Sequence, residues 1–310
     1  MSFNIELVKY DLGEVKIPIK DMCDQIDHNY ERLIKKSGFE IVHRTRLTEE
    51  IFFSNFLQSS LKLLRGDFVI FVNQSMKTSI PGGIPLLFAG IENIAFIGTL
   101  EISDGCTGFT RALVLANQIL STDEHKRVHI ICAEKYSKYY MNPDISVSPI
   151  FSDAISFTTI SKNGPYKLLG SKYSNFFQKS QSISVSEDVS GEAKIKMAGA
   201  EVLSWAINEI PTVVKELLYE NGLNSENIDS WLIHQGSRIV VETICEQIGI
   251  DPARNFTARN IGNTVSSSIP IMISQLGENK SGKYFNDGLI VMLGFGVGLS
   301  VVATLIEVKS

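Results

Sequence analysis

The chain has 310 residues, of which 44% are hydrophobic and 20% are charged, with a formal net charge of −5 and a pI of about 5.6. This is the composition of a folded globular protein, and the length suits either two domains or one large duplicated α/β unit. Because phosphate binding needs concentrated Lys and Arg, the acidic balance and the scattered basic residues argue against nucleic acid as a general partner.

The cysteines and the apolar stretches indicate the compartment. The four cysteines lie far apart, with neither a CxxC pair nor a paired Cys and His spacing: Cys23, Cys106, Cys132 and Cys245. We therefore expect neither a disulfide framework nor a zinc site. The N-terminal stretch carries acidic residues early and lacks the apolar core of a signal peptide, and no run of about 18 apolar residues follows. We expect a cytoplasmic protein without a membrane span.

The first half of the chain alternates between predicted strands and predicted helices. Strands are expected at residues 3–10, within 38–50, at 67–73 and at 128–134, and helices at 20–37, 51–64 and 86–90. A loop with Ser79-Ile80-Pro81-Gly82-Gly83 precedes the last of these helices. The runs DFVIFVN and VHIICAE are continuous and apolar, which is typical of buried strands. Strands separated by helices predict a largely parallel sheet with helices on both faces.

Residues 98–120 form the most informative segment of this half. The segment is a predicted strand that breaks at Asp104-Gly105-Cys106 and continues into a helix. A thiol at that break meets unpaired helical NH groups and the positive end of the helix dipole, so we expect its pKa to be lowered. Cys106 is thus a candidate nucleophile, with Gly105 and Gly108 leaving room for a substrate carbonyl. A lone cysteine in apolar surroundings is more often a packed hydrophobe, so other motifs must decide.

The second half repeats this organisation. A strand near residues 150–162 leads through a turn at 163–165 into exposed strands and loops at 166–188 and a long helix at 193–221, bent at Pro211. Residues 228–250 form a second strand-to-helix junction with His234 at the turn, and Asn263 opens a third. Two apolar strands within 289–308 are joined by a glycine-rich turn. We predict two similar halves, residues 1–165 and 166–310.

Four motifs carry a resemblance to a known family. They are DGCTGF at 104–109, HQGSR at 234–238, GNTVSSSIP at 262–270 and GFGVGLS at 294–300. In this order they resemble the ketoacyl-acyl-carrier-protein synthase III group of the thiolase superfamily, over nearly the whole chain but weakly over the first 90 residues or so. The resemblance implies an α/β thiolase-like duplicated fold, layered αβαβα with two mixed sheets, and a homodimer.

The resemblance also implies a catalytic triad of Cys106, His234 and Asn263, with no metal and no bound organic cofactor. Cys106 is acylated by acyl-CoA or acyl-carrier protein, and the acyl oxygen is held by its own NH and an NH of Gly296-Val297-Gly298. His234 and Asn263 hold the carbonyl oxygen of malonyl-carrier protein while CO₂ leaves. The implied reaction is a decarboxylative Claisen condensation that gives a 3-oxoacyl thioester and initiates fatty-acid or specialised-metabolite synthesis.

Basic residues and departures from the family pattern leave the substrates open. Arg238, Arg44 and Arg46 are candidates for binding the carrier protein or CoA, with an ordinary solvated surface as the competing interpretation. Gly236-Ser237 and Arg238 after the His-Gln pair resemble a specialised biosynthetic branch more than the fatty-acid initiator, and Val301-Val302 near the C-terminus are a second departure from the family pattern. The acyl chain and the acceptor stay undetermined.

Two other functions fit the same residues less well. One is an acyltransferase that passes the acyl group to an amine or a hydroxyl, which would not need Asn263. The other is a non-catalytic partner subunit of an active paralogue, which would not need the intact set. Individually, a histidine at a strand end is usually structural and an asparagine beside glycine usually forms a turn. Their occurrence together with the Cys106 motif favours catalysis.

Overall fold

The computed structural model describes residues 2–76, 81–92, 94, 97–122, 124–140, 146–187 and 193–309. The first two residues of the loop predicted before the short helix, 79 and 80, lie outside the described residues. The helices are α1 Ile19–Gln25, α2 Tyr30–Ser37, α3 Glu49–Ser60, α4 Gly83–Phe88, α5 Gly108–Leu120, α6 Gly199–Glu220, α7 Arg238–Ile248 and α8 Ser268–Leu276. The strands are β1 Ser2–Leu12, β2 Val15–Pro18, β3 Ile41–Arg44, β4 Phe68–Val72, β5 Gly98–Ile102, β6 Arg127–Glu134, β7 Ala154–Lys162, β8 Tyr166–Asn175, β9 Ile183–Glu187, β10 Ala193–Met197, β11 Ser230–Ile233, β12 Asn255–Phe256, β13 Gly288–Gly296 and β14 Ser300–Val308.

The main sheet has a symmetric strand order. Its ten strands run β12-β11-β13-β14-β8-β1-β7-β6-β4-β5, with parallel and antiparallel pairs. We number the five main-sheet strands of each half in chain order. From the centre outward, each half then runs first, fifth, fourth, second and third: β1-β7-β6-β4-β5 in one half and β8-β14-β13-β11-β12 in the other. The halves meet where β1 pairs with β8 through Phe3–Tyr166 and Ser2–Lys167, so the two expected sheets form one continuous sheet. This repeated order supports the division into halves at residues 165 and 166 that we propose.

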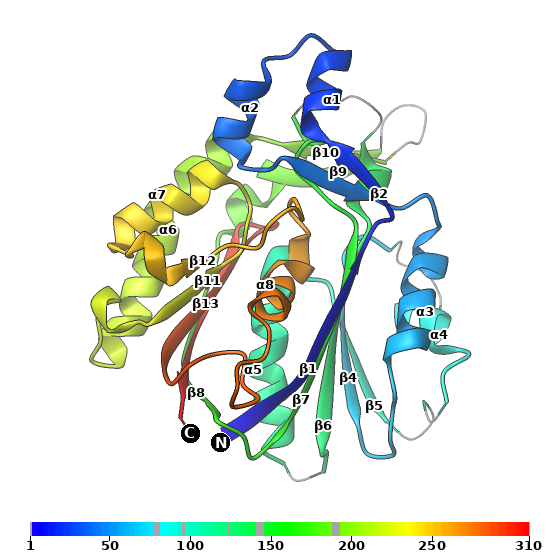
Figure 1. Cartoon of the computed structure of the whole chain (residues 1–310), viewed down its shortest axis with the longest axis vertical. Helices are drawn as coiled ribbons and strands as arrows, with labels where there is room; N and C mark the ends of the chain where they lie inside the picture. The colour runs from blue at the N-terminus through cyan, green and yellow to red at the C-terminus, as the bar shows by residue number, and fades with distance from the viewer. Residues whose placement is uncertain are drawn as a thin grey trace.

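Helices fill the space between the two halves of the sheet and cover both outer faces (Figure 1). Central helix α5 buries Phe109, Leu113 and Ala116, which recur at helical spacing, and contacts β4, β6 and β7 as well as β8, β13 and β14. Helix α8 lies beside it against β1 and β7. Helices α3 and α4 cover the outer face of the first half, and α6 and α7 that of the second. The expected αβαβα layering is present.

Two predicted helices differ from the structure. The helix predicted at 20–37 is split into α1 and α2, because Asp27 has a φ of 50° and Asn29 caps α2 by accepting the NH of Arg32. The helix predicted at 193–221 begins only at Gly199. Residues 193–197 form β10, which pairs with β9, and their alternating pattern buries Ile195.

Helix α6 is the longest, with 22 residues, and runs through Pro211 without ending there. It buries one face against α7, β8 and β14. Across the described ranges, no helix combines the length and the apolar character that crossing a membrane requires.

Candidate active site

Three turns from both halves converge on the thiol of Cys106. Cys106 lies in the 3-10 turn between β5 and α5, His234 directly follows β11, and Asn263 precedes the 3-10 turn Val265–Ser267 that leads into α8. Val265 and Val297 pack with Cys106 in one buried cluster, and the end of β13 lies against both the thiol and the imidazole. The structure therefore brings all three predicted turns together.

The backbone of Gly296 lies very close to the side chain of Cys106. A Cβ atom built there would lie 2.8 Å from Sγ of Cys106, and its φ of +150° is one that residues with a side chain rarely adopt. The next residue, Val297, donates a backbone hydrogen bond to the thiol. Only glycine fits at 296, and the NH that follows it acts on the sulfur of Cys106.

The environment of Cys106 corrects one sequence expectation. The side chain is 6% exposed, and burial raises the pKa of the thiol to about 12. The hydrogen bond from Val297 and one from the NH of Cys106 act in the opposite direction, while Glu134 and Asp104 oppose the thiolate. The predicted lowering of the pKa by the helix N-terminus is wrong, because loss of hydration outweighs the favourable backbone dipoles.

His234 is a neutral imidazole in this site. It is 1% exposed, and burial lowers its pKa to about 3. The ring stands edge-on to Phe295, with 5.4 Å between centroids, and the backbone NH donates to the carbonyl of Leu293 at 2.8 Å. Nδ1 is buried without a hydrogen-bond partner among the described residues. A neutral ring carries one NH, so His234 is suited to donate one hydrogen bond at neutral pH.

Asn263 has a fixed orientation. Its Oδ1 accepts the NH of Val265 at 2.9 Å, and because a backbone NH can only donate, the amide group must point the other way. Val265 itself has a φ of 53°, rare for a β-branched residue. The backbone of Asn263 bonds to Ile150 and Ser152 in the first half. Asn263 thus forms the turn and also presents two N–H donors.

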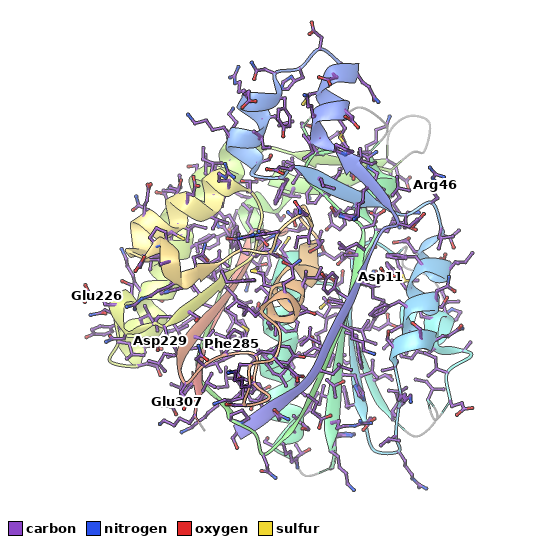
Figure 2. The ribbon with its side chains drawn as sticks, viewed as in Figure 1. Asp11, Arg46, Glu226, Asp229, Phe285 and Glu307 are labelled. Carbon is purple, nitrogen blue, oxygen red and sulfur yellow. The ribbon has the colours of Figure 1, made fainter. Side chains whose placement is uncertain are left out.

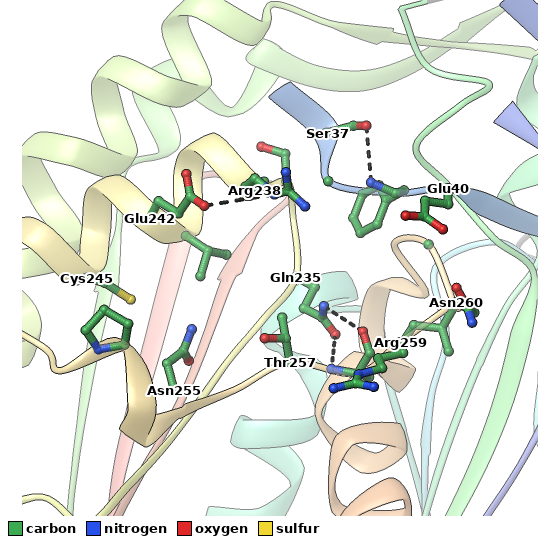
Figure 3. A pocket seen from close by; sticks show the side chains of 18 of the residues that line it. Ser37, Glu40, Gln235, Arg238, Glu242, Cys245, Asn255, Thr257, Arg259 and Asn260 are labelled. Carbon is green, nitrogen blue, oxygen red and sulfur yellow. Dashed lines mark hydrogen bonds and ion pairs between the residues drawn. The ribbon is translucent and has the colours of Figure 1, made fainter. Parts of the chain in front are cut away.

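The three arginines have different surroundings. Arg238 lines a groove of about 960 Å³ between the α2–β3 connection, α7 and residues 255–262 (Figure 3). Arg44 stacks on the ring of Tyr140 at 4.9 Å and donates to the carbonyl of Ser148. Arg46 lies at the periphery of the molecule (Figure 2). Of the three, only Arg238 lines the groove.

Two residues that the sequence analysis did not single out act on Cys106 or on the residue before it. Oε1 of Gln74 would lie 2.4 Å from a Cβ at Gly105, and it accepts the hydroxyl of Tyr136 at 3.2 Å. Glu134, at the end of β6, is fully buried and acts electrostatically on Cys106. A glutamate that ends an apolar strand was a usable signal, since functional groups gather at the carboxyl ends of parallel strands. Gln74 gave no comparable signal.

Among the described residues, no group of three or more His, Cys, Asp or Glu side chains is arranged to hold a metal ion. The four cysteines are free and buried. The functional groups placed around the thiol are instead backbone NH groups, an imidazole, carboxamides and one carboxyl group.

Comparisons with known proteins identify the family. The family model described as 3-oxoacyl-[acyl-carrier-protein] synthase III matches residues 100–175, and the model of its C-terminal part matches residues 218–308. Together they cover more than half of the chain and contain all three turns. The chain belongs to the 3-oxoacyl-acyl-carrier-protein synthase III family.

Individual members of the synthase III family align along most of the chain. A β-ketoacyl-[acyl-carrier-protein] synthase III of Staphylococcus epidermidis is 28% identical over 230 residues, 70% of this chain and 68% of its own. One from Halalkalibacterium halodurans is 25% identical over 309 residues, 93% of this chain and 91% of its own. These relatives extend the match beyond the motifs.

Solved structures agree on the fold. The synthase III of Aquifex aeolicus superposes with a TM-score of 0.86 at 22% identity, covering 99% of this chain and 100% of that one. The priming β-ketosynthase of the R1128 polyketide pathway gives 0.83 at 19% identity, over 99% and 96%. The α/β thiolase-like fold expected from the sequence is confirmed.

The close approach of Gly296 gives a first prediction. Gly296→Ala places a methyl group against Sγ, so we expect Cys106 to be acylated by acyl-CoA at least about tenfold more slowly, as intact-protein mass spectrometry would measure. Gly222→Ala is the matched control, because Gly222 also has a positive φ (68°) but open space around its Cβ position. Equal acylation rates in both variants would show that the approach at 296 does not matter.

Proposed function

We propose that this chain is a condensing enzyme that joins an acyl group to malonyl-carrier protein with loss of CO₂. The observation that carries the proposal is the meeting of Cys106, the NH of Val297, the neutral His234 and the oriented carboxamide of Asn263 in one buried site. The family membership supports the same reaction. The two alternative functions use only part of this set.

In the first half-reaction, Sγ of Cys106 attacks the carbonyl carbon of an acyl thioester. The C–S bond of the donor breaks, and CoA or the donor carrier leaves as a thiol with the proton that Cys106 gives up. Negative charge on the acyl oxygen faces the NH groups of Cys106 and Val297, which already point at the sulfur. Because burial keeps the free thiol protonated, these donors matter more than a preformed thiolate.

In the second half-reaction, N–H groups of His234 and Asn263 hold the thioester oxygen of the malonyl group. The C–C bond to the carboxylate breaks, CO₂ leaves, and its electron pair forms an enolate whose oxygen these donors stabilise. The enolate carbon attacks the acyl carbon, the C–S bond to Cys106 breaks, and the sulfur leaves as a thiolate that takes up one proton from water to restore the thiol. A neutral histidine suits this role because its N–H persists across the working pH range.

The proposal includes substrates, partners and compartment. The substrates are acyl-CoA or acyl-carrier protein and malonyl-carrier protein, no metal or bound organic cofactor takes part, and the compartment is the cytoplasm. Arg238 would contact the phosphate of CoA or of the carrier's pantetheine arm from its groove, with Arg44 and Arg46 as secondary candidates. Initiation of fatty-acid or specialised-metabolite synthesis is the place in metabolism that fits an acyl-accepting condensing enzyme.

Removing the N–H donors of His234 or Asn263 should separate the two half-reactions. In Asn263→Ala and His234→Ala, Cys106 should still be acylated, while release of labelled CO₂ from malonyl-carrier protein falls about 10² to 10³-fold, the usual effect of removing one such donor. Cys106→Ala should lose acylation altogether. Wild-type CO₂ release in Asn263→Ala, or acyl groups passed only to amines or hydroxyls, would contradict the proposal.

The groove gives a prediction about substrate binding. Arg238→Ala should raise the KM for a phosphopantetheine thioester about tenfold with little change in kcat, because one charged hydrogen bond is lost. Arg46→Ala removes an arginine at the periphery and serves as the matched control. If both variants behave alike, Arg238 is an ordinary surface residue.

The end of the sheet bears on assembly. Strand β5 is the outermost strand of the first half, and Leu100 on it is 39% exposed. An exposed strand edge is suited to pairing with a second copy, so we propose a homodimer through β5. Sedimentation equilibrium should give twice the chain mass for the wild type and a shift toward monomer for Leu100→Lys; a wild-type monomer at micromolar concentration contradicts it.

A further inference from the structure

Glu134 is a buried carboxyl group that the proposed mechanism does not use. It is the last residue of β6 and is 0% exposed. Its two oxygens accept the NH of Gln74 at 3.2 Å, the NH of Ser75 at 3.0 Å and the hydroxyl of Ser266 at 3.3 Å. These donors are uncharged and come from two different parts of the chain. A carboxyl group so placed is costly to bury, which calls for an explanation of its presence.

The first of these parts is the loop that follows β4. Glu134 accepts from the backbone NH of Gln74, and the side-chain amide of that residue lies against Gly105, the residue before Cys106. Ser75 continues the network: its hydroxyl accepts the NH of Lys135 at 2.9 Å and donates to Glu49 at 2.6 Å. Because Gln74 packs against the backbone beside Cys106, movement of this loop would displace the thiol.

The second part is the turn that carries Asn263. Ser266 belongs to the 3-10 turn Val265–Ser267, whose first NH is held by Oδ1 of Asn263. The neighbouring Ser267 donates to the carbonyl of Cys132 at 2.8 Å, so this turn from the second half is bonded to β6 twice. Glu134 thus joins the loop beside the nucleophile to the turn that presents the carboxamide.

Resting on the proposed role of Cys106 as the nucleophile, we propose that Glu134 is a positioning residue. Its carboxyl group fastens the loop after β4 and the Asn263 turn to the end of β6, and its charge, when present, opposes the thiolate of Cys106. It touches neither substrate nor the reacting atoms in this account.

The charge state of Glu134 follows from its surroundings. Burial raises its pKa to about 8, against the hydrogen bonds from Gln74 and Ser75, and the nearby carboxylate of Glu49 raises it further. The other titratable groups that interact with it are Cys106, Cys132, Tyr136 and Tyr139, and Glu49 is itself paired with Lys138. At pH 7 the carboxyl group is therefore mostly neutral, and it becomes charged as the pH rises through 8.

This ionisation should appear in the reactivity of Cys106. The alkylation rate of a thiol below its pKa rises tenfold per pH unit, but ionisation of Glu134 raises the pKa of Cys106 over the same range. We expect the logarithm of the rate with iodoacetamide to rise up to about pH 8 and then to flatten. In Glu134→Gln the rise should continue, so that at pH 9 the variant reacts about fivefold faster than the wild type.

The experiment measures alkylation of Cys106 in the full chain by peptide mass spectrometry from pH 6 to 10. Asp153→Asn is the control, because Asp153 is also buried, with a raised pKa and NH and hydroxyl donors from Thr45 and Ser137, but is not among the groups that act on Cys106. It should keep the wild-type shape. A wild-type profile without flattening, or the same shape in Glu134→Gln, overturns the electrostatic part of the proposal.

The positioning part needs a second variant. Glu134→Asp keeps the charge but shortens the side chain by one methylene, so it cannot reach both Ser266 and the Gln74–Ser75 loop. We expect discharge of acyl-Cys106 by malonyl-carrier protein to slow about tenfold in Glu134→Asp and to stay within about threefold in Glu134→Gln, which keeps the length. Equal rates of acyl-Cys106 discharge in the wild type and in Glu134→Asp overturn the positioning role of Glu134. The alkylation profile does not depend on condensation, so failure of the proposed function would leave that test intact.

Discussion

The close approach of the Gly296 backbone to the sulfur of Cys106 is the constraint on which the site depends. The two residues come from opposite halves of the chain, and there is no room for even a methyl group between them. The contact brings the NH of Val297 onto the thiol and sets Phe295 against His234. The repeated strand order and the central helices α5 and α8 bring the two strand ends together.

Burial keeps both titratable residues of the candidate site uncharged by shifting their pKa values in opposite directions. It keeps His234 neutral, which preserves the N–H that the proposed second half-reaction requires, and it also keeps Cys106 protonated. In the proposed mechanism, hydrogen-bond donors already in place stabilise the negative charge that develops on the substrate oxygens. Such donors need little reorganisation during the reaction. Glu134 is a further buried titratable group, and in the role that we propose for it the neutral form at pH 7 places no negative charge near the thiolate of Cys106.

Local sequence was sufficient for the features that depend on neighbouring residues. The three turns and most strands follow from apolar periodicity and from motifs only a few residues long, whereas the catalytic roles of Cys106, His234 and Asn263 come from the family resemblance and stay predictions. The break at Asp27 and the strand at 193–197 were missed because a positive φ and a β9 partner outweighed helical periodicity. The contacts of Gln74 and Glu134 escaped because they join segments about 60 and 130 residues apart. The pKa of Cys106 was predicted with the wrong sign because its burial depends on residues from both halves.

The central claim is that Cys106 carries the acyl group and that malonyl-carrier protein removes it. The most direct measurement is the mass of the intact wild-type chain after incubation with a panel of acyl-CoAs, and again after malonyl-carrier protein is added. The account predicts a mass gain of one acyl group that is confined to the peptide with Cys106 and disappears on the second addition, with a 3-oxoacyl thioester appearing on the carrier. A gain that malonyl-carrier protein leaves in place, or no gain with any donor, would contradict it.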